Sequence, residues 1–134
     1  MKLADTSVIV AAAQSWNPAN DLAAAALVGC RRAISHTLLE TYSVLTRSPS
    51  PFRIDGATAY AWLTAQFTSE VSLPGESHLA TLSQLHDLGV SGGAIYDGII
   101  ALTAAHFRAT LITLDKRAIT TYAKCGVKFQ LLSA

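Results

Sequence analysis

The chain has 134 residues, of which 51% are hydrophobic and 14% are charged, and its formal net charge is +1. This length suits one domain, and the composition is too apolar and too weakly charged for a disordered chain. A net charge near zero excludes a protein that binds nucleic acid through bulk positive charge, so any such contact depends on a few placed groups. The two cysteines, Cys30 and Cys125, are too few for a disulfide framework and indicate reduced thiols.

The N-terminal segment resembles a signal peptide only weakly. Lys2 precedes the apolar run Val8 to Ala13, but Asp5 lies between them and the run is too short for an ordinary apolar signal region. The longest apolar runs are also shorter than the roughly 18 residues that a membrane span requires. We therefore expect a cytoplasmic protein that has no membrane contact and whose first residues belong to the fold.

Short strand patterns alternate with helix patterns along the chain. In chain order we predict strand 2–5, helix 6–14, helix 18–28, strand 32–35, helix 36–47, helix 56–67 capped by Asp55, strand 70–73, helix 76–88, helix 94–107, strand 109–114, helix 116–124 and strand 127–132. Extension of the first strand through residues 8–10 is the alternative at the N-terminus. The helix over 94–107 is apolar nearly all round, which predicts that it is buried. The alternation predicts an α/β fold with a central, mainly parallel sheet of about five strands and helices on both faces.

The nine acidic residues divide into two groups. Five lie at helix starts or among polar neighbours, where carboxylates have ordinary structural roles: Asp21, Asp55, Glu70, Glu76 and Asp87. The other four lie among apolar neighbours: Asp5 and Asp115 at strand ends, Glu40 beside Leu38 and Leu39, and Asp97 alone in an apolar helix. Burying a carboxylate without a partner costs several kcal/mol or raises its pKa, so four such residues need a common explanation.

The predicted topology supplies this explanation. Asp5 and Asp115 end parallel strands and so share the carboxyl edge of the sheet, where ligands bind in such folds. Asp97 falls in the first turn of its helix and Glu40 about one turn into another, so all four can surround one cleft. A hard divalent cation relieves the repulsion among them, and oxygen ligands without clustered Cys or His suit Mg²⁺ or Mn²⁺. Mg²⁺ often shares substrate phosphates, which points to phosphodiester or phosphoryl chemistry.

Single acids also have structural interpretations, which the sequence leaves open. Asp5 and Asp115 are suited to cap the helices that follow them, and Asp97 is suited to the first turn of its own helix. Glu40 is in mid-helix and has no capping role. Taken jointly, the four acids favour a shared metal site.

In order and spacing, the four acids match four motifs, and the chain resembles PIN-domain ribonucleases, most closely the VapC toxins of toxin–antitoxin pairs. The motifs are the strand ending in Asp5-Thr6-Ser7, Glu40 within residues 36–47, Tyr96-Asp97 leading into residues 98–105, and Thr113-Leu114-Asp115. The resemblance covers essentially the whole chain. It implies a single PIN domain over residues 1–134, folded as a Rossmann-like α/β/α sandwich. It also implies metal-dependent cleavage of structured RNA such as tRNA or rRNA, a VapB-type antitoxin partner and a homodimer.

The sequence and this resemblance together suggest a role for each candidate residue. Asp5, Glu40, Asp97 and Asp115 are the expected catalytic and Mg²⁺-binding residues, and the metal activates a water for attack on a phosphodiester. Hydroxyls beside these acids orient carboxylates or waters: Thr6, Ser7 and Thr113. Cations near them are candidates to bind RNA phosphates, with solvated surface charge as the alternative: Arg47, Lys116 and Arg117.

Three other classes of protein also place acids or a PIN-like fold in such a chain. A phosphoacceptor receiver module needs paired acids after the first strand, but Asp5 is followed by Thr6 and Ser7. A haloacid-dehalogenase-type phosphatase needs Asp-x-Asp, but Ser7 stands at the second position. A catalytically inactive PIN-fold module that acts through antitoxin or RNA contacts stays as the alternative function.

Overall fold

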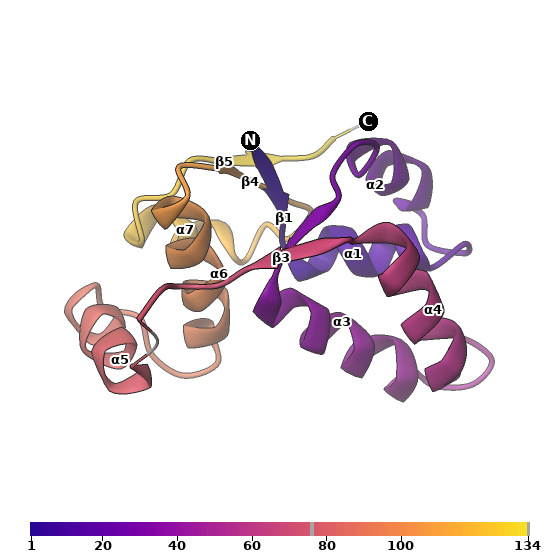
Figure 1. Ribbon diagram of the computed structural model, residues 1–134, viewed down its shortest axis with the longest axis horizontal. Helices are drawn as coiled ribbons and strands as arrows, with labels where there is room; N and C mark the ends of the chain where they lie inside the picture. The colour runs from indigo at the N-terminus through magenta and orange to yellow at the C-terminus, as the bar shows by residue number, and fades with distance from the viewer. Residues whose placement is uncertain (76, 134) are drawn as a thin grey trace.

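The computed structural model describes residues 1–75 and 77–133, and in this part of the chain five strands alternate with seven helices (Figure 1). In chain order they are β1 (Lys2–Ala4), α1 (Thr6–Ala13), α2 (Asn20–Ala26), β2 (Arg32–Ile34), α3 (Ser35–Arg47), α4 (Gly56–Gln66), β3 (Ser69–Val71), α5 (His78–Asp87), α6 (Ala94–His106), β4 (Thr110–Thr113), α7 (Ile119–Lys124) and β5 (Phe129–Leu131). The predicted α/β fold and its five strands are confirmed. Glu76, predicted at a helix start, lies outside the described residues.

Every strand pairing is parallel. β1 pairs with β4, β4 pairs with β5, and β2 pairs with β3. Hydrogen bonds thus join the strands as a group of three and a group of two, and β2 lies beside β1. Because the strands run in one direction, the residues that follow β1 and β4 meet at one edge. The Asp5 N–H donates to the Ile112 carbonyl there at 3.0 Å.

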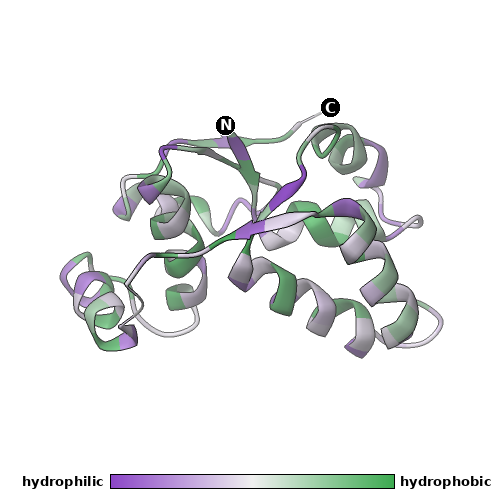
Figure 2. Cartoon of the chain, in the orientation of Figure 1, coloured by the Kyte–Doolittle hydropathy of each residue, from purple (hydrophilic) through white to green (hydrophobic). Residues whose placement is uncertain are grey.

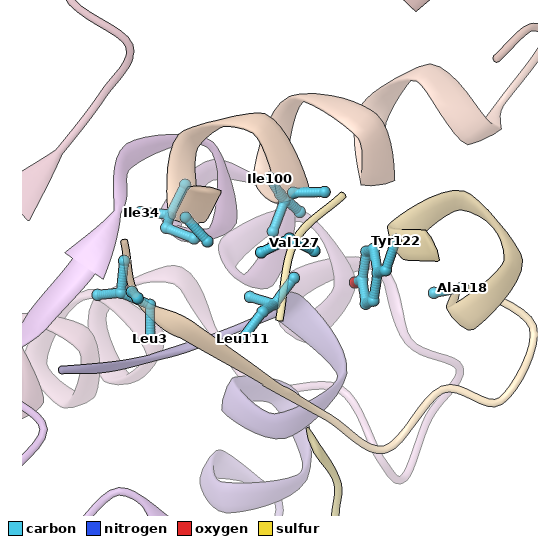
Figure 3. Close-up of a cluster of buried hydrophobic side chains, with 10 residues drawn as sticks. Leu3, Ile34, Ile100, Leu111, Ala118, Tyr122 and Val127 are labelled. Carbon is cyan, nitrogen blue, oxygen red and sulfur yellow. The ribbon is translucent and has the colours of Figure 1, made fainter. Parts of the chain in front are cut away.

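The apolar strand residues face both sides of the sheet, because successive side chains in a strand point to opposite faces. Leu3 and Leu111 pack in the cluster that α6 and α7 cover (Figure 3). Ala4 and Ile112, the next residue of each strand, pack in the cluster formed with α1, α2 and α4. Figure 2 shows apolar residues gathered on α1 and α6, on either side of the strands. The predicted three-layer α/β/α sandwich is therefore confirmed.

The helix over Ala94–His106 is buried along most of its length, as predicted, with six fully buried positions from Gly98 to Ala104. It also brings Asp97, in its first turn, to the carboxyl edge of the sheet. None of the described helices has both the length and the apolar character needed to cross a membrane.

The start of the last helix was predicted wrongly. α7 begins at Ile119, three residues later than expected from the sequence. Asp115 closes a turn instead, because its Oδ1 accepts the backbone N–H of Arg117 at 2.9 Å. Lys116 and Arg117 consequently lie in a turn ahead of the helix, and both are exposed to solvent.

Candidate active site

Asp5 is a buried carboxylate between β1 and α1, with only 2% of its surface exposed. It is the N-cap of α1, and its Oδ1 accepts the Val8 N–H at 3.3 Å and the Ser7 hydroxyl. Burial raises the pKa of the Asp5 carboxyl, and the hydrogen bonds that it accepts oppose this rise. The capping role and the site role therefore coincide in one residue.

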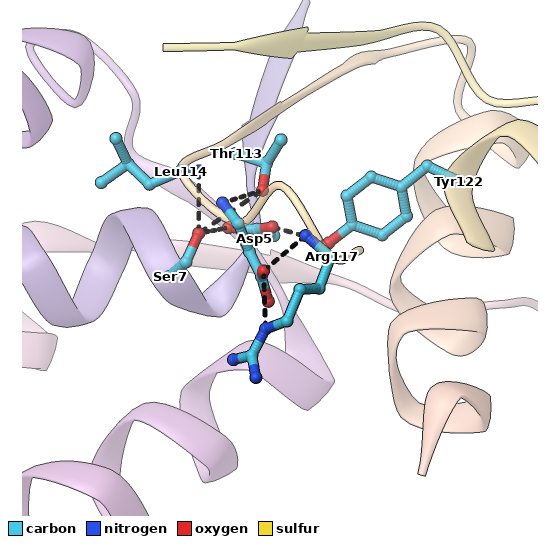
Figure 4. Close-up of polar contacts among 7 residues, drawn as sticks. Asp5, Ser7, Thr113, Leu114, Arg117 and Tyr122 are labelled. Carbon is cyan, nitrogen blue, oxygen red and sulfur yellow. Dashed lines mark hydrogen bonds and ion pairs between the residues drawn. The ribbon is translucent and has the colours of Figure 1, made fainter. Parts of the chain in front are cut away.

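Tyr122 of α7 holds the other oxygen of Asp5. The Tyr122 hydroxyl donates to Asp5 Oδ2 at 2.6 Å, and the tyrosine side chain is fully buried (Figure 4). Burial raises the pKa of the Tyr122 hydroxyl, and the Asp5 charge raises it further, so Tyr122 stays protonated and donates. Both oxygens of Asp5 are thus fixed by the protein before any ligand arrives.

No pattern in the sequence marks Tyr122 for this role. The chain has four tyrosines, of which Tyr96 belongs to a motif, and nothing in the pattern around Tyr122 separates it from Tyr42 or Tyr60. A buried tyrosine hydroxyl needs a partner, but burial of this position follows from the packing of α7 against the sheet. The sequence shows only that Tyr122 follows Asp115 by seven residues.

Ser7 and Thr113 fasten the ends of two strands together (Figure 4). Ser7 Oγ accepts the Leu114 N–H at 2.9 Å, and Thr113 Oγ1 accepts the Asp115 N–H at 3.0 Å. The two hydroxyl oxygens lie 3.5 Å apart. This network joins the residue after β1 to the residues after β4, so it sets the relative positions of Asp5 and Asp115.

Glu40 lies on α3 with its side chain 33% exposed. The Thr6 hydroxyl donates to Glu40 Oε1 at 2.8 Å, and His36 Nε2 lies 3.7 Å from the same oxygen. The premise that core residues flank Glu40 holds for Leu38, which packs partly buried against the cluster of α1, α2 and α4, but it is wrong for Leu39, which is 73% exposed. The buried side of α3 is instead formed by Thr37, Thr41 and Leu45.

The pKa of Asp97 shows that the other acids lie close to it. Burial is the main cause that raises the pKa of Asp97 to about 6. The negative charges of Glu40, Asp115 and Asp5 add to this rise, in that order, and Arg117 partly offsets it. The four acids that the sequence singled out therefore lie within electrostatic reach of one another at the carboxyl edge.

The three predicted phosphate-binding cations differ in their positions. Arg117 is 95% exposed, and its Nε lies 3.6 Å from Asp115 Oδ1. Lys116 is exposed in the same turn, beside the acids. Arg47 is exposed in the last turn of α3, about 10 Å along the helix from Glu40. The structure thus keeps Lys116 and Arg117 near the acids and sets Arg47 apart from them.

The donor set fits a hard divalent cation that keeps much of its water. Within residues 1–75 and 77–133, no three Asp, Glu, His or Cys side chains form a group that could hold an ion. Mg²⁺ commonly takes one or two carboxylates and several waters, so a dense protein cage is not required. The half-exposed carboxylates of Glu40 and Asp115, and the raised pKa of Asp97, are what a cation at this edge would engage and relieve.

An apolar groove of about 580 Å³ lies beside the acids, between α3, α5 and α6. None of the four acids lines it. The rings of His36 and Tyr96, both in its lining, are stacked with centroids 5.5 Å apart. Because His36 also contacts Glu40, this stacked pair forms the border between the groove and the acidic edge.

A family model described as PIN domain matches residues 2–124. The chain belongs to the PIN domain family. It is 38% identical over 131 residues to Ribonuclease VapC40 in two strains of Mycobacterium tuberculosis, which covers 96% of this chain and 97% of the relative. It is 42% identical over 92 residues to Ribonuclease VapC27 of the same species, which covers 69% of this chain and 67% of the relative. The predicted resemblance to VapC-type PIN proteins is confirmed.

Solved structures support the PIN fold independently. FitAcB from Neisseria gonorrhoeae matches with a TM-score of 0.63 at 18% identity, covering 96% of each chain. PAE2754 from Pyrobaculum aerophilum matches with a TM-score of 0.61 at 20% identity, covering 96% of this chain and 89% of the other. At these identities the comparison concerns the fold alone.

The raised pKa of Asp97 predicts a pH-dependent stability. In the unfolded chain the Asp97 carboxyl has its ordinary value of 3.8, so the folded protein loses stability as pH rises from about 4 through about 6. Without divalent cations, Asp97→Asn should raise the Tm by about 2–4 °C at about pH 7.5, and the gain should shrink toward pH 4. Asp21→Asn, at an exposed position, is the control. A gain of equal size at both pH values would contradict the electrostatic cause.

The Tyr122–Asp5 hydrogen bond predicts a second effect on stability. Tyr122→Phe keeps the packed ring but leaves Asp5 Oδ2 without a donor in a buried place, which should cost about 1–3 kcal/mol. Urea unfolding measures the difference. Tyr60→Phe is the matched control, because Tyr60 is 65% exposed and its change should stay within about 0.5 kcal/mol. Equal values for the two variants would show that the bond does not support the fold.

Proposed function

We propose that this protein is a metal-dependent endoribonuclease and acts as a VapC-type toxin. The observation that carries the proposal is the cluster of four acids at the carboxyl edge, where burial and then the charges of the other three acids raise the pKa of Asp97. The names of its relatives, Ribonuclease VapC40 and Ribonuclease VapC27, support RNA as the substrate class. We extend this to structured RNA, such as tRNA or rRNA, and to a single PIN domain over residues 1–134.

Asp5, Glu40, Asp97 and Asp115 are the proposed ligands of one Mg²⁺ or Mn²⁺ ion, directly or through water. When bound, such an ion lowers the pKa of a coordinated water and offsets charge on the phosphate. The ionised form of Asp97 is needed to attract the ion, and its pKa of about 6 makes this form dominant at neutral pH. Below about pH 6 we therefore expect both ion binding and RNA cleavage to weaken.

The remaining site residues act on the four acids and on the substrate. The Thr6 hydroxyl orients Glu40, and Ser7 with Thr113 fixes the strand ends that carry Asp5 and Asp115. Lys116 and Arg117, in their exposed turn, are placed to contact RNA phosphates beside the acids. Arg47 is assigned to a phosphate further along the bound RNA.

RNA cleavage by the purified protein tests this proposal. Total cellular RNA is incubated with Mg²⁺ or with EDTA, and new ends are mapped by sequencing. We expect discrete new ends with Mg²⁺ and none with EDTA. Asp97→Ala should lower the cleavage rate by about 100-fold or more, because it removes several kcal/mol of transition-state stabilisation. Asp21→Ala, which changes an exposed acid at the start of α2, should leave the rate unchanged.

The result that overturns the proposal is the absence of new ends from a folded protein over this broad RNA pool. The four acids would then have no hydrolytic role, and the alternative function, an inactive PIN-fold binding module, would replace the nuclease. Equal loss of activity in Asp97→Ala and Asp21→Ala would likewise remove the assignment of Asp97 to the site.

We further propose a VapB-type antitoxin as the inhibitory partner, a homodimer as the assembly, and the cytoplasm as the place of action. Exposed apolar side chains on α3 and α5, including Leu39 and Leu79, support contact with other protein surfaces. Light scattering should give twice the chain mass for the protein alone. A co-purified antitoxin should suppress the Mg²⁺-dependent cleavage, and a monomer or an uninhibited complex would refute the respective assignment.

A further inference from the structure

The net charge of +1 conceals an uneven distribution of charge along the strands. The carboxyl edge carries the four acids of the site. The opposite, amino edge carries cations: Lys2 begins β1, Arg31 and Arg32 stand at the start of β2, and Arg108 and Lys128 precede β4 and β5. All five side chains are exposed. In Figure 2 the starts of β1 and β2 are purple, the colour of hydrophilic residues.

Three of these cations share one hollow, which we call the cationic hollow and define by Lys2, Arg31 and Arg32. It has a volume of about 460 Å³, and none of its described lining residues carries a carboxylate. The start of β1 and the segment before β2 lie close together, and the Cys30 thiol donates a weak hydrogen bond to the Lys2 carbonyl at 3.5 Å. The carboxylate of Glu70 on β3 instead accepts a hydrogen bond from the Ser35 hydroxyl at 3.1 Å.

Structural roles account for only one of the three cations. Arg31 Nη1 donates to the carbonyls of Ala65 and Gln66, so it satisfies the C-terminal end of α4. Arg32 Nη1 has only a weak contact, with the Met1 sulfur at 3.7 Å. Within residues 1–75 and 77–133, neither Lys2 nor Arg32 forms an ion pair. Two cations therefore remain available to an anion.

The cationic hollow lies within reach of a substrate bound at the acids. Lys2 and Asp5 are three residues apart along an extended segment, so about 10 Å separates the two edges. A folded RNA is larger than this distance and can contact both edges. Near the acids, Lys116 and Arg117 are placed to contact phosphates, but the four carboxylates outnumber them, so that edge offers RNA little net attraction.

We propose that the cationic hollow binds the phosphate backbone of the RNA substrate at a distance from the cleavage site. This inference rests on the proposed function, since it takes RNA as the ligand. The acids repel RNA and the hollow attracts it, so the hollow supplies affinity for long RNA while the carboxyl edge performs the cleavage. A short RNA reaches only the carboxyl edge.

The test compares charge reversal in the hollow with a matched reversal elsewhere. Lys2→Glu with Arg32→Glu removes the two available cations and leaves Arg31, which α4 needs. The control is Arg53→Glu with Ser83→Glu and Gln84→Glu, which makes the same change in net charge at exposed positions outside the hollow. Circular dichroism and urea unfolding verify that each variant is folded.

Binding is measured by fluorescence anisotropy in EDTA, with a labelled RNA hairpin of about 30 nucleotides and a single strand of about six. Reversal in the hollow should weaken hairpin binding about tenfold or more near 0.1 M salt. It should also reduce the slope of log K against log salt by about 1.5, for two lost phosphate contacts. Cleavage of the short strand with Mg²⁺ should keep its wild-type rate, and the control variant should bind the hairpin within about twofold of wild type.

Each other outcome has a distinct meaning. If the wild type cleaves RNA but the reversal leaves hairpin binding unchanged, the proposed role of the hollow is wrong and the proposed nuclease function stands. If hairpin binding depends on the hollow but no RNA is cleaved, the proposed role of the hollow stands and the proposed nuclease function is wrong. Equal losses in the reversal and the control variants overturn the hollow, because they show a general charge effect. Binding of an acidic peptide such as polyglutamate, but not of the hairpin, overturns RNA as the ligand.

Discussion

The buried carboxylate of Asp5 is the constraint around which the site is built. A charge this deeply buried is tolerated only where hydrogen bonds satisfy it. Ser7 and the Val8 N–H supply these bonds from α1, and Tyr122 supplies another from α7, which lies 117 residues further along the chain. The same residue ends β1 and begins α1. β1, α1 and α7 are therefore tied to one side chain, and the hydrogen bonds of Ser7 and Thr113 hold Asp115 beside that junction.

The parallel sheet also determines which helix ends lie near this junction and so which charges are favoured there. With all strands in one direction, helix N-termini gather at the carboxyl edge, where the helix dipole favours negative charge. Asp5 caps α1, and Asp97 lies in the first turn of α6. The dipoles offset part of the repulsion among the acids, but the pKa of about 6 for Asp97 shows that repulsion and burial still dominate. The amino edge, where helices end, is correspondingly suited to cations.

This arrangement separates the parts of the molecule that specify the fold from those that specify chemistry. The two solved structures share the fold at 18% and 20% identity, so many core sequences support it. The polar network at the strand ends depends on few side chains, since Ser7 and Thr113 each engage a backbone N–H of the residues that follow β4. Such a site tolerates variation in the surrounding helices as long as the strand ends stay in register.

The sequence by itself determined the order of the elements, because periodicity, Gly and Pro signals and cap residues act over a few neighbours. It also singled out Asp5, Glu40, Asp97 and Asp115, because carboxylates in apolar surroundings stand out without any structure. Only the tertiary structure decided what depends on distant neighbours. Burial of Tyr122 against Asp5 and exposure of Leu39 follow from packing between segments far apart in the chain. The turn that moves Lys116 out of α7 is local by contrast, because the Asp115 side chain accepts the Arg117 N–H. The opposite charges of the two sheet edges are likewise a product of topology, which the near-zero net charge conceals.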